Sequence, residues 1–202
     1  MFELANNKND WDWCYEGHPS RNNSEFNNTV QVRRLIEKLI KAWDANEVRP
    51  SHVYSIISMC DKALSQLDID YKNNEPIPIC YFSELQTIGA LLVDVYLRSN
   101  NLQTYLVGIK DQDELDNTIS IWEKETPKVI IFSFSALNYI DMVKTRGSAL
   151  KALNTKIFAG GIVFKRSSEE KDHLPFFHFP SSLRLLLKHV ESGSERWLPV
   201  SA

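Results

Sequence analysis

The sequence has few of the features that reveal a protein's chemistry on their own. Its three cysteines are scattered and no CxxC pair occurs, which argues against a disulfide framework and against a zinc site built on cysteine pairs. No apolar run approaches the roughly 20 residues that span a bilayer, and the N-terminus shows no secretory signal. Seven glycines and eight prolines in 202 residues are too few for a collagen-like or low-complexity chain.

Charge of either sign is not in excess. The chain has 23 basic residues against 26 acidic ones and a formal net charge of −3, which provides no general attraction to nucleic acid. The nucleophile motif G-x-S-x-G and the phosphate-loop motif G-x-x-x-x-G-K-[ST] are both absent. These features predict a soluble cytoplasmic protein that is not an enzyme and does not bind nucleic acid or membrane directly.

Residue patterns divide the chain into an Asn-rich N-terminal tail, a pair of helices, a larger α/β domain and a short C-terminal tail. The corresponding ranges are 1–28, 29–68, 76–192 and 193–202. In the first tail, the aromatic residues of the motif WDWCY, including Trp11 and Trp13, indicate docking on its own domain or on a partner. Apolar residues at helical spacing predict amphipathic helices over Thr29–Asn46 and from Ser51 to Leu67.

From residue 76 onward, short apolar runs alternate with amphipathic helices. The predicted strands are Ile77–Phe82, Leu102–Val107, Lys128–Ser133, Lys156–Ala159 and Phe176–Phe179. The predicted helices are Glu84–Ser99, Glu114–Lys124, Ile140–Leu153 with an interruption at Gly147, and Ser181–His189. This alternation favours a parallel sheet with helices on both faces. We therefore expect a doubly wound, Rossmann-like or flavodoxin-like α/β fold with five parallel strands, preceded by the short helical module.

Three loops follow the first, third and fourth predicted strands at their carboxyl ends, where ligands of such sheets bind. They are Glu84–Gly89, Ser135–Leu137 and Gly160–Gly161. The glycine that ends the first loop lets a ligand or a neighbouring strand approach the helix closely, and the glycine pair leaves room beside the sheet. Ser135 offers a hydroxyl for a hydrogen bond, and Leu137 offers an apolar wall.

Local structure alone can also account for these loop residues. Ser83-x-x-Gln86 fits a capping box that starts a helix. The pair Gly160-Gly161 suits a tight turn, and Ser135 suits a cap of the next helix. An isolated histidine is most often a surface residue or a hydrogen-bonded one.

In their order and strand context, the three loops resemble those of the vitamin B12-binding domain family. That family carries D-x-H-x-x-G after strand one, S-x-L after strand three and G-G after strand four. Here Glu84–Gly89 keeps the glycine of the first motif, while Gln86 stands where the family has its histidine. The resemblance covers about residues 76–191 and implies cofactor-binding roles for a set of loop residues. These are Glu84, Gln86, Gly89, Ser135, Leu137, Gly160 and Gly161.

The resemblance implies cobalamin as the cofactor, with haem as the alternative, because variants similar to this family bind haem. In the family, the histidine of the first loop ligates cobalt. A neutral amide is a much poorer ligand, so Gln86 is not expected to bind the metal. That face of the ring would be free, hold water, keep its own base or take another residue. His173, His178 and His18 are the candidate metal ligands.

The family includes light- or redox-responsive regulators of gene expression, and a helical module that caps the ring often precedes the binding domain. Residues 29–67 occupy that place here. The resemblance thus implies a non-enzymatic sensor, such as a photoreceptor, that holds a tetrapyrrole or keeps a degenerate site. It would signal to a protein partner, a transcription regulator. Two alternatives are a corrinoid carrier for a methyltransferase or mutase, and a cofactor-free protein-interaction module on the same fold.

Overall fold

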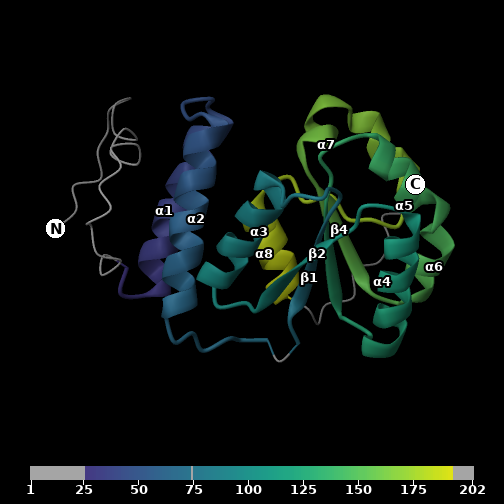
Figure 1. Ribbon diagram of the computed structural model, residues 1–202, viewed down its shortest axis with the longest axis horizontal. Helices are drawn as coiled ribbons and strands as arrows, with labels where there is room; N and C mark the ends of the chain where they lie inside the picture. Colours follow the sequence, from purple (N-terminus) through teal and green to yellow (C-terminus); the bar gives the residue numbers. More distant parts are fainter. Residues whose placement is uncertain (1–25, 74, 193–202) are drawn as a thin grey trace.

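The computed structural model describes residues 26–73 and 75–192 as a layered arrangement of parallel strands and helices (Figure 1). Most of the predicted N-terminal tail, with Trp11, Trp13 and His18, lies outside the described residues. The C-terminal tail from residue 193 lies outside them as well. What the sequence predicts for these segments therefore stays a prediction.

In the described part of the chain, four parallel strands form the sheet. They are β1 (Ile77–Tyr81), β2 (Thr104–Gly108), β3 (Val129–Ser133) and β4 (Lys156–Gly160). Their order is β2-β1-β3-β4. The chain passes from β1 to β2 at one edge of the sheet, returns to β3 beside β1, and continues to β4 at the opposite edge. The strand order reverses between β1 and β3, which is the switch point where such sheets bind ligands. The prediction of a parallel α/β sheet is confirmed in this respect.

The fifth predicted strand, Phe176–Phe179, is reduced to one residue, and the prediction of a five-stranded sheet was wrong. His178 forms an isolated parallel bridge with Phe158 of β4, and its N–H donates to the carbonyl of Ile157 over 2.8 Å. Pro180 has no N–H with which to continue a ladder. The segment therefore leaves the edge of the sheet after this short contact.

Helices connect and cover the strands. They are α1 (Thr29–Asp44), α2 (Pro50–Gln66), α3 (Ile88–Ser99), α4 (Gln112–Glu125), α5 (Asn138–Thr145), α6 (Gly147–Ala152), α7 (Ile162–Arg166) and α8 (Leu183–Glu191), with a 3-10 helix at Ser168–His173. The predicted helix Ile140–Leu153 is two helices that meet at Arg146, next to Gly147. Neither α7 nor the 3-10 helix was predicted. Elements of five and six residues are too short for their apolar residues to show a helical period.

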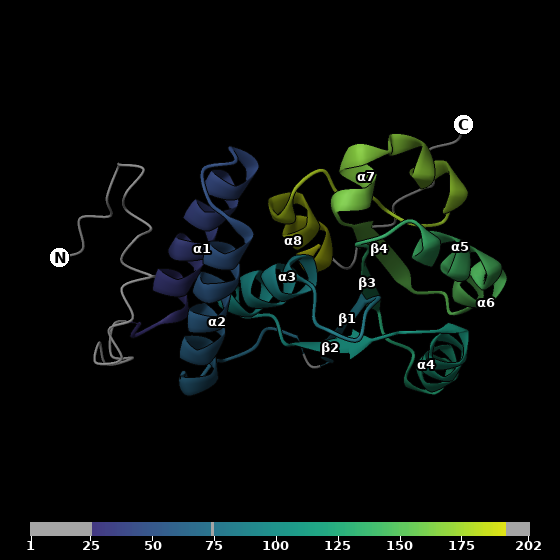
Figure 2. The same cartoon turned by 45° about the horizontal axis from the view of Figure 1, so that its top comes forward.

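The helices lie on opposite faces of the sheet, and the helical pair adds a further layer (Figure 2). One face is covered by α3 and α8, the other by α4 to α7, and the pair α1 and α2 packs on α3. Alternate strand residues supply two hydrophobic cores. Ile79 and Ile131 face α3 and join a core that extends into the helical pair, whereas Cys80 and Phe132 join the core under α4 to α7.

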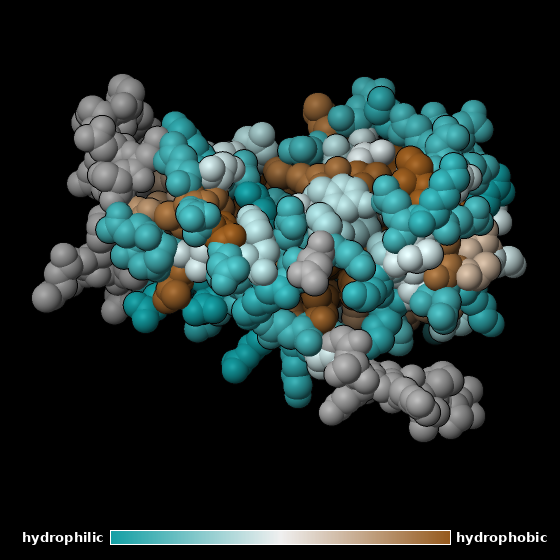
Figure 3. All heavy atoms as spheres, turned by 90° about the horizontal axis from the view of Figure 1, so that it is seen from below, coloured by the Kyte–Doolittle hydropathy of each residue, from teal (hydrophilic) through white to brown (hydrophobic). Residues whose placement is uncertain are grey.

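The surface of the described residues is mostly hydrophilic when the molecule is seen from below, with separate hydrophobic patches (Figure 3). None of the described helices combines the length and the apolar composition needed to cross a membrane. Scattered exposed apolar residues are ordinary in proteins, so their meaning depends on where they lie.

Candidate functional site

The carboxyl ends of β1, β3 and β4 lie side by side at one edge of the sheet. Tyr81 at the end of β1 is paired with Ser133 of β3, which is paired in turn with Gly160 of β4. Each loop singled out in the sequence begins at one of these three residues or within a few positions after it. The structure therefore brings the three predicted loops to a common edge, at the switch point of the sheet.

The two adjacent glycines at the end of β4 have different roles. Gly161 has a φ of +127°, and a Cβ there would lie 2.0 Å from the backbone oxygen of Phe134, so its conformation and its surroundings both require glycine. The Phe134 N–H donates to the Gly160 carbonyl over 2.9 Å. A tight turn therefore accounts for Gly161. At Gly160 a Cβ would meet no atom within 4 Å, so this glycine borders open space.

Gly89 lets the first turn of α3 lie directly against the end of β3. A Cβ at this position would come within 2.9 Å of Ser133 Oγ, and Ser133 is buried. Because something would have to shift to make room for a side chain, glycine at this position serves close packing of helix and strand. Of the two roles predicted for Gly89, the geometry supports the approach of a neighbouring strand.

The loop after β1 is longer than predicted, because α3 begins at Ile88 instead of Glu84. The Thr87 hydroxyl caps the helix by accepting a hydrogen bond from the N–H of Ala90 over 3.3 Å. Thr87 is a good N-cap residue, and it lies four positions after the serine that the sequence pattern favoured. The later start leaves several loop residues beside the strand ends.

The capping box predicted for Ser83 and Gln86 is wrong. Ser83 Oγ accepts a hydrogen bond from the N–H of Leu85 over 3.2 Å, which closes a turn within the loop. Glu84, Leu85 and Gln86 are all exposed. Gln86 therefore has no role in starting α3, and its side chain is accessible at the edge of the sheet.

The loop after β3 holds a polar group that the fold does not use. Leu137 occupies the N-cap position of α5, which has no side-chain cap, so the prediction that Ser135 caps this helix was wrong. Ser135 is exposed, and its hydroxyl forms no hydrogen bond with the residues that the structure describes. This hydroxyl is available to a ligand at the strand ends.

Three large apolar side chains are exposed at the same edge, one after each strand. Leu85 follows β1 and is 79% exposed, Leu137 follows β3 and is 53% exposed, and Ile162 follows β4 and is 44% exposed. Contact with an apolar ligand would stabilise them by roughly 25 cal/mol per Å² removed from water. Leu85 and Ile162 were missed as site residues in the sequence, although their places shortly after predicted strands could have indicated them.

The two described histidines that the sequence offers as metal ligands lie elsewhere. His178 lies beside the middle of β4, its ring 5.5 Å from that of Phe158, and burial lowers its pKa. His173 lies on the 3-10 helix, with its Nδ1 3.3 Å from Nζ of Lys144. Among the described residues, no cluster of His, Cys, Asp or Glu is suited to hold a metal ion. His18 lies outside these residues.

A partly buried network anchors the base of the helical pair to α3 and β2. Arg98 of α3 donates to Asp94 over 2.7 Å and to Asp61 of α2, and Asp94 also accepts from the Thr104 hydroxyl of β2. Burial alone would lower the pKa of Arg98, but the charges and hydrogen bonds of Asp94 and Asp61 raise it above its ordinary value. The guanidinium stays charged and links three elements.

In the described part of the chain, one exposed ion pair links the other end of the helical pair to the elements after β3. Asp44 at the end of α1 pairs with Lys165 of α7 over 2.8 Å, and both side chains are more than half exposed. An exposed pair of this kind contributes at most about 1 kcal/mol. The tip of the helical pair, defined as the end of α1 and the start of α2, is therefore held more weakly than the base.

Comparisons with known proteins bear on the fold. No family model matches the sequence, and no curated protein matches it. Among solved structures, a cobalamin-binding protein from Desulfitobacterium hafniense DCB-2 is similar, with a TM-score of 0.57 and 14% sequence identity. The match covers 81% of this chain and 80% of that chain. The similarity shows that this chain shares the α/β fold of that protein, with a Rossmann-like parallel sheet.

Proposed function

We propose that this protein is a non-enzymatic binding module that holds a cobalamin-type tetrapyrrole at the carboxyl edge of its sheet. The observation that carries the proposal is the exposure of Leu85, Leu137 and Ile162 around the strand ends, with open space at Gly160. The apolar part of a corrin face buries its surface well on such side chains. The name of the structural neighbour and the resemblance of the loops support the same ligand class. Haem has no such support.

The residues present fit the ring better than they fit its metal. Gly160 leaves room beside the sheet for a substituent of the ring, and the Ser135 hydroxyl can donate a hydrogen bond to it. Gln86 is a poor metal ligand, so the metal would keep a ligand of its own or bind water. When bound, the group would supply a metal centre whose ligands and oxidation state can change.

The proposed signal passes through the helical pair to a protein partner, for which we propose a transcription regulator. The pair is fixed at its base by Arg98, while Asp44 and Lys165 form an exposed contact at its tip. A ligand shifts the position of the tip only if it binds one arrangement more tightly than the other.

Gln86 argues against a corrinoid carrier, because such carriers use a ligating histidine. A cofactor-free interaction module is the conclusion if no cobalamin binds.

Retention of cobalamin tests the proposal directly. The full-length protein, incubated with aquocobalamin and separated from the excess by gel filtration, is expected to carry the visible absorbance of the corrin in its own peak. Leu137→Ser is expected to weaken binding about tenfold, because it removes an apolar contact. Ile121→Ser is the matched control, since Ile121 has a similar exposed fraction but lies on α4.

Gly160→Leu fills the open space at the edge and is expected to abolish retention. Circular dichroism should show that this variant keeps its helices. Two results would overturn the proposal: a wild-type protein that retains no cobalamin, and an equal loss of binding in Ile121→Ser. Retention of haem instead of cobalamin would change the ligand class and keep the site.

The exposed ion pair at the tip leads to a separate prediction about movement. Lys165→Glu places an acidic side chain opposite Asp44, and the repulsion between the two should move the tip of the helical pair away from α7. Spin labels at Glu47 and Arg166 are therefore expected to show a longer and broader distance distribution. The labels are attached to cysteines in a Cys14→Ser background and measured by pulsed electron paramagnetic resonance. Raising the salt to about 1 M should shift the wild-type distribution in the same direction, because salt screens exposed ion pairs. The reversed pair, Asp44→Lys with Lys165→Glu, should restore the short distance, and an unchanged distribution in Lys165→Glu would contradict the prediction.

A further inference from the structure

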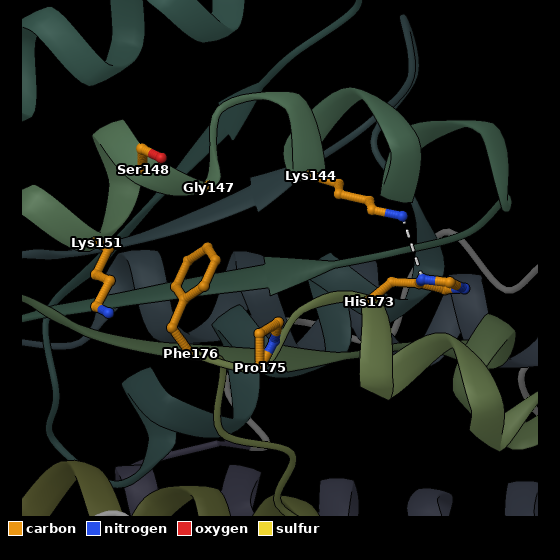
Figure 4. Close-up of a pocket in the computed structure, with 7 residues that line it drawn as sticks. All are labelled: Lys144, Gly147, Ser148, Lys151, His173, Pro175 and Phe176. Atoms are coloured by element: carbon orange, nitrogen blue, oxygen red, sulfur yellow. Dashed lines mark hydrogen bonds between the residues drawn. The ribbon is translucent and has the colours of Figure 1, made fainter.

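A pocket of about 390 Å³ lies at the junction of α5 and α6 (Figure 4). Its walls come from the end of α5, from α6, and from the end of the 3-10 helix with the segment that follows it. The side chains that line it are Lys144, Ser148, Lys151, His173, Pro175 and Phe176. None of them belongs to the proposed cobalamin site, so a ligand bound here would be a second and independent one.

The pocket carries positive charge that the surrounding fold does not neutralise. Nζ of Lys144 lies 3.3 Å from Nδ1 of His173, so in this contact the ammonium donates to an imidazole nitrogen instead of a carboxylate. Neither Lys144 nor Lys151 forms an ion pair with any residue that the structure describes. The carboxylate of Glu170, 3.9 Å from Nε2 of His173, approaches the edge of the pocket. Two ammonium groups without acidic partners attract an anion.

The pocket also has an apolar surface that suits a ring. Figure 4 shows the ring of Phe176 between the two lysine side chains, next to Pro175. Gly147 makes room for it, because a Cβ there would lie 3.1 Å from Cε1 of Phe176. Phe176 is half-buried and packs on Phe177 with 4.7 Å between the ring centroids. The remaining part of the Phe176 ring is therefore available to a ligand in the pocket.

We propose that this pocket binds a small aromatic anion, with its phosphate or carboxylate paired with Lys144 beside His173 and a planar ring on Phe176. An inorganic anion would use the charge alone and leave most of the volume to water. A ligand with a ring also covers the apolar wall, as ligands of pockets of this size do. The Ser148 hydroxyl adds a hydrogen-bond donor at the start of α6.

Titration of the full chain with phenyl phosphate, monitored by isothermal titration calorimetry, tests this proposal. Phenyl phosphate is expected to bind about tenfold more tightly than inorganic phosphate, because its ring covers Phe176. Benzoate is expected to compete with it. Lys144→Gln should weaken binding about fivefold by removing the charged partner of the anion. Lys41→Gln removes the same charge from an exposed position on α1 and should leave binding unchanged.

The variant Phe176→Leu separates the ring from the charge. It should keep the affinity for inorganic phosphate and lose the preference for phenyl phosphate. The proposal is overturned if phenyl phosphate binds no more tightly than inorganic phosphate, or if Lys41→Gln weakens binding as much as Lys144→Gln does. Should Phe176→Leu fail to fold, competition in the wild-type protein decides, because benzoate that leaves phenyl phosphate bound contradicts a shared site.

Discussion

Gly161→Ala is expected to lower the free energy of unfolding by about 3 kcal/mol or more. The φ of +127° and ψ of 171° lie in a region that glycine alone adopts readily, at a cost of about 1–3 kcal/mol for other residues. The added methyl group would also lie 2.0 Å from the backbone oxygen of Phe134. A backbone atom cannot turn aside as a flexible side chain can. The end of β4 or the loop after β3 must shift, and the hydrogen bond between Phe134 and Gly160 is strained.

The neighbouring variant Gly160→Ala is the matched control. A Cβ at Gly160 would meet no atom within 4 Å, so its stability is expected to stay within about 0.5 kcal/mol of the wild type. Denaturation by guanidinium chloride, followed by circular dichroism, measures both variants on the same scale. Equal stability of Gly160→Ala and Gly161→Ala would contradict the geometry of the turn.

Arg98→Met is expected to cost about 3–5 kcal/mol of stability, because it leaves the carboxylate of Asp94 buried without its cation. The side chain of Asp94 is 8% exposed and that of Arg98 is 13% exposed, so water cannot replace the lost partner well. The same variant releases Asp61 of α2 and so loosens the base of the helical pair. Thermal and chemical denaturation of the full chain would measure the loss.

Two further variants show whether the buried charge or the link to α2 causes the loss. Asp61→Asn affects the half-exposed end of the network and is expected to cost at most about 1 kcal/mol. The double variant Asp94→Leu with Arg98→Met replaces the buried pair by apolar side chains and is expected to recover much of the stability. A loss below about 1 kcal/mol in Arg98→Met alone would show that Asp94 is better solvated than the structure indicates.

The four strands and the meeting of their loops could be predicted because both depend on local patterns. Lys128–Ser133 is continuously apolar from Val129 to Phe132, and a strand buried on both faces of a parallel sheet needs that composition. Once the alternation of strands and helices implied a parallel sheet, the positions of Gly89, Ser135 and Gly160 near its carboxyl edge followed from chain direction. No contact between distant residues had to be known for this step.

The features that were missed depend on competition between neighbours or on distant contacts. Ser83 and Thr87 are both good N-cap residues, and the sequence does not tell which of them starts α3. The short fifth strand depends on how far the chain can follow β4 before Pro180. No sequence pattern links Asp61 to Arg98, because they lie on separate helices, and the structure brings them together across 37 residues.

The packing of α3 has a consequence for how the chain can be divided. Asp94, Val95, Tyr96 and Leu97 are four consecutive buried residues. At 3.6 residues per turn they point in every direction around the axis, so this turn of α3 is enclosed on all sides, as a turn of an interior helix is. The helical pair supplies one side of that enclosure. A fragment that begins at residue 76 would leave an apolar side of α3 in water, so we expect the two segments to fold as one cooperative unit and the linker between them to be a poor point of excision.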